Sequence, residues 1–184
     1  MSILKVAHMG HPVLRAKARP IAPADVRHAA LQALIDDMLD TMGEYHGVGL
    51  AAPQIHESLR VFVGLLESPK PEAGKDGDDA VEPEPIAIIN PEITPLGDEV
   101  VEDWEGCLSI PDIRGRVPRA REIRLRGFDR EGGRIDLTLR DFPARVAQHE
   151  TDHLDGILYL DRLTAERKKS ALREARDKDW FWKR

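Results

Sequence analysis

His149 and His153 lie four residues apart, with Glu150 between them. On an α-helix, positions i and i+4 lie on the same face one turn apart, so both imidazoles could bind one metal ion. The carboxylate at i+1 could then contact a water molecule on that ion, which is the chemistry of the H-E-x-x-H pattern. The same pattern also occurs by chance, as a polar patch on a helix that binds no metal.

The residues around this motif favour a helix. Asp141 is a good N-cap residue type, and Pro143 falls in the first turn, where its missing N–H costs nothing. Gly156 is a typical helix stop. Between these ends, apolar and histidine side chains recur at helical spacing, at Phe142, Val146, His149 and His153.

A catalytic zinc site usually has three protein ligands and leaves the fourth position for water or substrate. Asp155 follows the second histidine too closely on the same helix, and no histidine occurs after His153, so the known peptidase patterns fail. Upstream lies Cys107, next to Gly106, which permits close backbone approach. Because a thiolate is a strong metal ligand, we predict a site made of Cys107, His149, His153 and one water molecule.

The composition is that of one globular domain. The chain has 184 residues, 41% hydrophobic and 33% charged, and contains no apolar run of about 18 residues that could span a membrane. Its start lacks the pattern of a secretory signal, and its single cysteine excludes an intramolecular disulfide. We therefore predict a single catalytic domain over residues 1–184, located in a reducing cytoplasm.

One segment differs from the rest in charge. Residues 67–85 hold seven acidic residues and two lysines, which is −5 of the net charge of −6. Their Pro, Gly and Asp content predicts a solvated, flexible insertion within the domain rather than a linker between two domains. Because the remainder is close to neutral, the net charge identifies no partner.

Around the motif helix, the sequence predicts short strands and two further helices. Residues 10–23 contain three prolines and should be irregular, whereas residues 25–45 carry one apolar stripe typical of a helix. The other expected elements are strands at residues 59–66, 86–93 (interrupted at Asn90), 99–101, 121–128, 134–139 and 157–160, and a C-terminal helix from Thr164 to about Trp180. The run D-R-E-G-G at residues 129–133 predicts that the strands on either side of it form a hairpin. The fold class is therefore α+β, with short antiparallel strands packed around a buried central H-E-x-x-H helix and with an N-terminal and a C-terminal helix.

Three runs of sequence together resemble one known family. They are G-V-G-L-A-A-P-Q at residues 47–54, E-G-C-L-S at residues 105–109 and Q-H-E-T-D-H at residues 148–153. The chain resembles the peptide deformylases, which remove the formyl group from the N-terminal methionine of newly made bacterial or organellar polypeptides. Residues 11–15 also resemble the opening arm of that family. The acidic insertion departs from the family pattern but replaces no motif residue.

The resemblance implies a metal centre with assigned roles. Cys107, His149 and His153 would bind one Fe²⁺ per chain, and Zn²⁺ or another divalent metal could replace it. Coordination rules alone would have favoured zinc for these three ligands. Glu150 would take the proton of a metal-activated water molecule and deliver it to the leaving amine.

The resemblance also implies how the substrate is held. The side-chain amide of Gln54 and the backbone N–H of Leu108 would stabilise the developing oxyanion. Four further positions match the substrate-binding residues of the family, which hold the peptide like an added strand: Val48, Gly49, Gly106 and, near the far end of the substrate, Arg114. Asp152 could orient a metal ligand, although a plain surface carboxylate is an equal alternative.

The resemblance further implies the partners. The substrates would be N-formylmethionyl nascent peptides, with no membrane association and no direct DNA binding. Residues 161–184 hold nine basic and five acidic residues, and some bacterial members contact the ribosome through this helix, which makes the ribosome a candidate partner.

Two other functions stay open at this point. One is a metallopeptidase or a cysteine hydrolase that uses Cys107 and a histidine without metal. The other is a degenerate relative retained as a binding protein. Such a relative would lack at least one of the residues that the chemistry requires. All of these residues are present in the chain: Gln54, Cys107, His149, Glu150 and His153.

Overall fold

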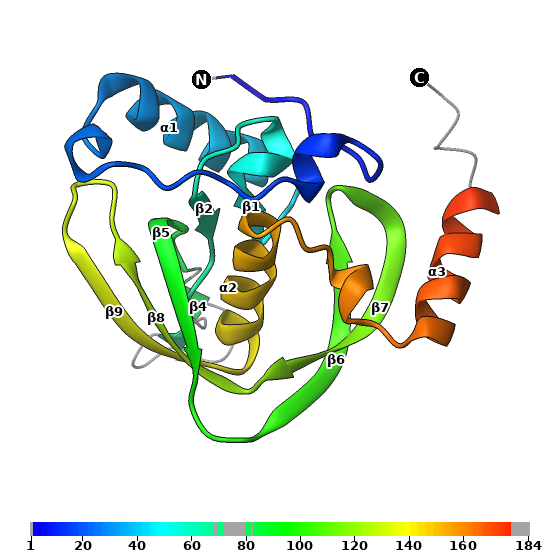
Figure 1. Ribbon diagram of the computed structural model, residues 1–184. Helices are drawn as coiled ribbons and strands as arrows, with labels where there is room; N and C mark the ends of the chain where they lie inside the picture. The colour runs from blue at the N-terminus through cyan, green and yellow to red at the C-terminus, as the bar shows by residue number, and fades with distance from the viewer. Residues whose placement is uncertain (1, 68–69, 72–79, 82, 178–184) are drawn as a thin grey trace.

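The computed structural model describes residues 2–67, 70–71, 80–81 and 83–177. A five-stranded antiparallel sheet forms one side of the molecule (Figure 1), with the strand order β1 (Gly49–Ala51), β2 (Val61–Gly64), β5 (Ile86–Pro95), β8 (Glu122–Phe128) and β9 (Arg134–Arg140). The other strands pair in two antiparallel hairpins: β6 (Val100–Cys107) with β7 (Ile110–Ala120), and the short β3 (Lys70–Pro71) with β4 (Ala80–Val81).

Helix α2 (Asp141–Leu154) lies between the five-stranded sheet and the β6–β7 hairpin (Figure 1). It packs against strands of both, including β1, β2, β9 and β7. Ala144, Ala147 and Leu154 belong to the core that it shares with the sheet. Because strands cover α2 on both sides, most of its polar side chains are buried, including both histidines. The predicted α+β arrangement around a central helix is confirmed.

Helix α1 (Ala29–Glu44) covers β1 and β2. Its buried Leu31, Ile35, Met38 and Met42 recur three or four residues apart, which is the spacing of one helix face. The helix begins later than predicted, because residues 23–25 form a separate 3-10 turn, η2 (Pro23–Asp25). His28 is the N-cap residue, and its side chain accepts a hydrogen bond from the N–H of Ala30.

The C-terminal end of α2 agrees with the prediction, whereas the N-terminal end does not. Arg140, not Asp141, occupies the N-cap position and makes no side-chain capping bond. Asp141 instead has a φ of 54° and accepts a hydrogen bond from Arg121 at 2.8 Å. At the other end, Gly156 has a φ of 73°, and a Cβ there would lie 2.7 Å from the carbonyl oxygen of Arg15. Glycine is therefore required where α2 stops.

Two segments differ from their predicted structure. Strand β7 was not predicted, because Pro111, Gly115 and Pro118 argue against a strand; it forms in a two-stranded hairpin, where a missing donor is tolerated. Residues 157–160, predicted as a strand, lead into a 3-10 helix, η4 (Tyr159–Arg162). The hydroxyl of Tyr159 donates to the carbonyl of Ile113 at 3.0 Å, which ties η4 to β7.

The remaining predictions differ mainly in their boundaries. Strand β6 is longer than predicted, β2 is shorter, and β5 has the expected irregularity, a register shift between Ile89 and Glu92. Strands β8 and β9 form the predicted hairpin. Helix α3 (Ala165–Asp177) matches the C-terminal prediction as far as it is described, while Trp180 and most of residues 67–85 lie outside the described residues.

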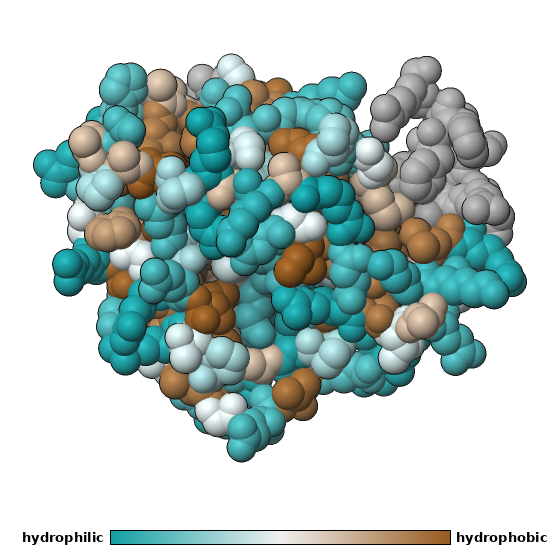
Figure 2. All heavy atoms as spheres, in the orientation of Figure 1, coloured by the Kyte–Doolittle hydropathy of each residue, from teal (hydrophilic) through white to brown (hydrophobic). Residues whose placement is uncertain are grey.

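On the face of the molecule shown in Figure 2, the described residues form no wide apolar area. Hydrophilic side chains predominate there, and the apolar ones form small, separate areas. Among the helices of the described residues, none combines the length and the apolar character that a membrane crossing requires.

Candidate metal centre

Cys107, His149 and His153 converge at one point. Cys107 ends strand β6, and both histidines project from α2. The Sγ atom of Cys107 lies 3.2 Å from Nε2 of His153, which lies 3.2 Å from Nε2 of His149. These three side chains are the group of possible metal ligands that the described part of the chain brings together. Three soft or borderline donor atoms facing one another in a buried site fit a divalent transition metal.

Glu105 fixes the orientation of one of these imidazoles. Its Oε2 lies 2.9 Å from Nδ1 of His149. A hydrogen bond there places the proton on Nδ1 and leaves Nε2 free to bind a metal. The sequence interpretation missed this role of Glu105, although the residue lies two positions before Cys107 in the second motif.

Glu105 is ionised despite its burial. Burial raises the pKa of its carboxyl group, but the hydrogen bonds from His149 and Arg119 outweigh burial and hold the pKa far below its usual range. Arg145 also donates to Glu105, at 2.7 Å. The candidate ligand His149 is thus bound by a carboxylate that is itself bound by two guanidinium groups.

Glu150 lies buried beside the ligands, with only 4% of its surface exposed. Its Oε2 has no hydrogen-bond partner among the residues that the structure describes, and burial raises the pKa of the carboxyl group to about 7. On its other side is Gly49 of β1, where a Cβ atom would lie within 2.8 Å of the Glu150 side chain. Glycine at this position therefore makes room for the carboxylate.

Gln54 and Leu108 both border Cys107. Gln54 lies in η3 (Ala52–Ile55), directly after β1, and its Nε2 is 3.5 Å from Sγ of Cys107. Its amide also donates to Oγ of Ser109 at 3.2 Å and accepts from the N–H of Ala51 at 2.9 Å. Leu108 follows Cys107 in the turn between β6 and β7. The site therefore holds donor groups from two separate segments.

The predicted substrate-binding residues lie on the strands beside the ligands. Val48, which is 43% exposed, directly precedes the edge strand β1, and Gly49 opens that strand. Gly106 lies on β6 beside Cys107, and a Cβ there would lie 3.7 Å from Cγ of Arg114 on β7. All four predicted substrate residues are thus on β1, next to it, or on the β6–β7 hairpin.

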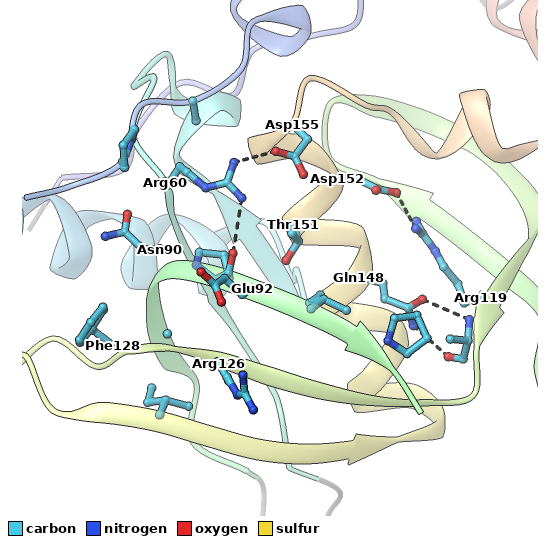
Figure 3. A pocket seen from close by; sticks show the side chains of 18 of the residues that line it. Arg60, Asn90, Glu92, Arg119, Arg126, Phe128, Gln148, Thr151, Asp152 and Asp155 are labelled. Atoms are coloured by element: carbon cyan, nitrogen blue, oxygen red, sulfur yellow. Dashed lines mark hydrogen bonds and ion pairs between the residues drawn. The ribbon is translucent and has the colours of Figure 1, made fainter. Parts of the chain in front are cut away.

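Of the two alternatives left open for Asp152, the structure excludes the plain surface carboxylate. Asp152 is buried and bonds to Arg119 at 2.5 Å and to Arg162 at 2.6 Å, so it is neither a surface carboxylate nor a direct partner of a histidine. It faces a cavity of about 1770 Å³ (Figure 3), which is lined by Gln148, Thr151 and Asp152 of α2 and by Asp155 directly after the helix. None of the three converging side chains lines this cavity, which therefore lies on the other face of α2. We call it the rear cavity.

The comparisons with known proteins all point to one family. Residues 3–169 match the family described as polypeptide deformylase. Peptide deformylase 1 of Nitrosomonas europaea is 47% identical over 169 residues, which cover 90% of each chain. Peptide deformylase 2 of Nostoc sp. is 44% identical, over 88% of this chain and 86% of its own.

Solved structures give the same result. A peptide deformylase from Legionella pneumophila aligns with a TM-score of 0.81 at 34% identity, over 100% of this chain and 99% of its own. A class I type b peptide deformylase from Acinetobacter baumannii, solved with Met-Ala-Ser bound, aligns at 0.78 and 38% identity, over 88% and 99%. The chain therefore belongs to the peptide deformylase family, the metal-dependent hydrolases that remove the N-formyl group from newly made polypeptides.

Proposed function

We propose that the chain carries out the reaction of its family at the centre formed by Cys107, His149 and His153, with Glu150 as the proton carrier. The observation that carries this proposal is the convergence of three ligand atoms beside a buried carboxylate that has an unpartnered oxygen. The Acinetobacter relative binds Met-Ala-Ser, which is the product that deformylation of a formylmethionyl peptide would leave. N-formylmethionyl nascent peptides are accordingly the proposed substrates.

The proposed cofactor is one Fe²⁺ per chain, and Zn²⁺ or another divalent ion could take its place. The family is the basis for iron, since a thiolate and two imidazoles suit several transition metals. A divalent ion held by these ligands supplies Lewis acidity, which lowers the pKa of a water molecule and polarises the formyl carbonyl.

Glu150 is the proposed general base and acid. It takes a proton from the attacking water and passes it to the leaving amine, so that the formyl C–N bond breaks and formate and a free amine result. Its raised pKa of about 7 suits a group that both accepts and donates a proton near neutral pH. Gly49 closes one side of the carboxylate, which leaves the side toward the ligands open.

Gln54 and Leu108 are the proposed oxyanion donors. The Gln54 amide is anchored by Ala51 and Ser109, so its N–H is already oriented when charge develops on the formyl oxygen. Backbone groups at Val48, Gly49 and Gly106 would bind the substrate as an extended strand between β1 and β6. Arg114 would lie near the far end of that peptide.

Several wider expectations remain proposals. The chain is proposed to form a single catalytic domain over residues 1–184, with residues 67–85 as an insertion, and to act in the cytoplasm. The C-terminal helix α3 carries Arg167, Lys168, Lys169 and Arg173 and is proposed as the contact with the ribosome.

One preparation tests the proposal. We expect elemental analysis to find one equivalent of divalent metal and a formate assay to show release from formyl-Met-Ala. A chelator should abolish release, and metal should restore it. Rapid inactivation of the metallated enzyme by a thiol alkylator, with activity unaffected by the chelator, would instead indicate a thiol hydrolase. A protein that binds peptide without releasing formate would indicate a binding protein.

A further inference from the structure

A chain of charged side chains leads from the surface to the proposed metal centre. It runs from Arg162 to Asp152, then to Arg119, to Glu105 and finally to Nδ1 of His149. The successive bonds measure 2.6, 2.5, 2.9 and 2.9 Å. Cations and anions alternate over its first four members, and the imidazole of His149 ends it. We call these five residues the ion chain.

The middle of the ion chain is buried and rigid. Arg119, Glu105 and Asp152 are each less than 10% exposed. Arg119 grips both oxygens of Glu105, through Nε and Nη2, each at 2.9 Å. A two-point bond between planar groups fixes the plane of the carboxylate as well as its position. The plane of Glu105 decides where Oε2 points, and Oε2 is the atom that meets His149.

The outer end of the ion chain is accessible. Arg162 belongs to η4, its side chain is 45% exposed, and it grips Asp152 with Nη2 at 2.6 Å and Nε at 3.1 Å. In Figure 3, Asp152 projects from α2 and meets Arg119 at the border of the rear cavity. Arg162 also lines this cavity. Asp152 and Arg119 therefore connect η4 to the carboxylate that holds the metal ligand.

We infer that Arg119 and Arg162 are positioning residues of the metal centre, and that η4 sets the orientation of His149 through the ion chain. Neither arginine touches the converging donor atoms, so each acts through Glu105. This inference rests on the proposed function, because it assumes that His149 binds a metal through Nε2. Residues that orient a metal ligand typically change metal affinity by about 10- to 100-fold.

The first measurement is zinc affinity, by competition with a chromophoric chelator. We expect Arg119→Lys, which keeps the charge but loses the two-point bond, to weaken zinc binding by about 10- to 100-fold. Arg162→Ala should weaken it by about two- to fivefold, because its ion pair is partly exposed to solvent. The visible spectrum of the Co²⁺-substituted protein should shift in both variants, since it reports the geometry of the ligands.

Arg60→Ala is the matched control. Arg60 also binds an aspartate, Asp155, which is the C-cap residue of α2, at 2.7 Å. Its bonds to the carbonyls of Leu154 and Pro91 likewise lie outside the ion chain. If loosening the end of α2 were sufficient, Arg60→Ala would weaken zinc binding as much as Arg162→Ala. We expect zinc affinity and the Co²⁺ spectrum of Arg60→Ala to match those of the unmodified protein. An equal effect of both substitutions would overturn the inference.

Glu105→Gln tests the path itself. If the effect passes through Glu105, Arg162→Ala should no longer change zinc affinity when Glu105→Gln is already present. Additive effects would contradict the ion chain. This pair also decides the matter if Arg119→Lys does not fold. An unmodified protein that binds zinc and releases formate, together with an unchanged Arg162→Ala variant, would refute this inference alone. An unmodified protein that binds no metal would refute the proposed function as well.

Discussion

The polar groups on the two faces of α2 differ in whether they have hydrogen-bond partners. On the face toward the proposed metal centre, Oε2 of Glu150 and Nδ1 of His153 are buried and have no hydrogen-bond partner within the described part of the chain. On the face toward the rear cavity, Gln148 bonds to both backbone groups of Ala120, and Asp155 bonds to Arg60 (Figure 3). Asp152 has two arginine partners on that face. Thr151, whose hydroxyl has no partner, is the exception.

This difference separates chemistry from architecture within one helix. A buried polar group without a partner costs free energy, so a folded protein retains one mainly where a ligand, metal or substrate will supply the partner. The paired groups of the rear face hold α2 against β7 and the sheet. Substitutions on the face toward the proposed metal centre, here called the front face, should therefore affect turnover. On the opposite, rear face, substitutions outside the ion chain, such as those of Gln148, should affect stability.

The largest effect is expected for Cys107→Ala. Cys107 is the one proposed ligand that α2 does not provide, so its loss should remove bound metal and formate release together. Metal content per chain and formate release, measured on the same preparation, test this. A variant that stays active with one equivalent of metal would show that the front face binds its metal without the thiolate.

Glu150→Ala should retain the metal, because the carboxylate is not a ligand, while its rate falls by about 10²–10⁴. The same assays apply, with Gln148→Ala as a control from the adjacent rear-face position. Loss of metal from Glu150→Ala, or near-normal turnover, would contradict the division between ligands and proton carrier.

Gln54→Leu should slow turnover by about 10²–10³, which is the usual effect of losing one oxyanion donor. The side chain also bonds to Ala51 and Ser109, so the melting temperature should fall as well. Metal content should be unchanged. Steady-state kinetics at full metal occupancy test the donor role: a destabilised variant with normal kcat would mean that Gln54 only braces the loop.

The unpartnered Glu150 should make the metal-free protein less stable as pH rises. Burial raises its pKa from 4.5 to about 7, so the folded state binds more protons than the unfolded state between these values. The resulting stability is present below pH 4.5 and lost as pH rises through about 7, by about 3 kcal/mol at most. Glu150→Gln should flatten this part of the pH profile in urea unfolding. A profile identical to that of the unmodified protein would contradict the assignment.

The smallest effect on turnover is expected for Gln148→Leu. It removes bonds to Ala120 at 2.9 and 3.1 Å and should lower the free energy of unfolding by about 1–3 kcal/mol. Turnover of the folded, metallated variant should stay within about twofold, because the side chain points away from the ligands. Urea titration measures the free energy of unfolding, and steady-state kinetics measure kcat. Slow turnover with normal stability would show that the two faces of α2 do not differ in this way.

The sequence predicted what depends on local pattern. The spacing of His149 and His153 and the stop at Gly156 define most of α2, and the turn at residues 129–133 defines the β8–β9 hairpin. Strand β7 was not predicted because its prolines disfavour a strand locally. Pairing with β6 and burial of alternate side chains stabilise it in the folded protein. Such tertiary stabilisation has no local signature.

The ion chain could not be predicted for a related reason. Glu105 and Arg119 meet because the pairing of β6 with β7, which sets Glu105 opposite Gly115 and Val101 opposite Arg119, puts both side chains on the same face of the hairpin, where both are buried. A shift by one residue would turn either side chain outward. Asp152 showed the same limit, since its spacing on the helix gave its face but not its arginine partners.

The distance along the chain between the ligands has a consequence for folding kinetics. Cys107 and His153 are 46 residues apart, so the metal centre exists only after β6 has docked onto α2. Such long-range contacts form slowly, and a metal that binds only the folded state adds to its stability. Because the complete centre is absent until late in folding, bound metal should slow unfolding much more than it speeds folding. The supply of metal would then set the lifetime of the folded chain as well as its turnover.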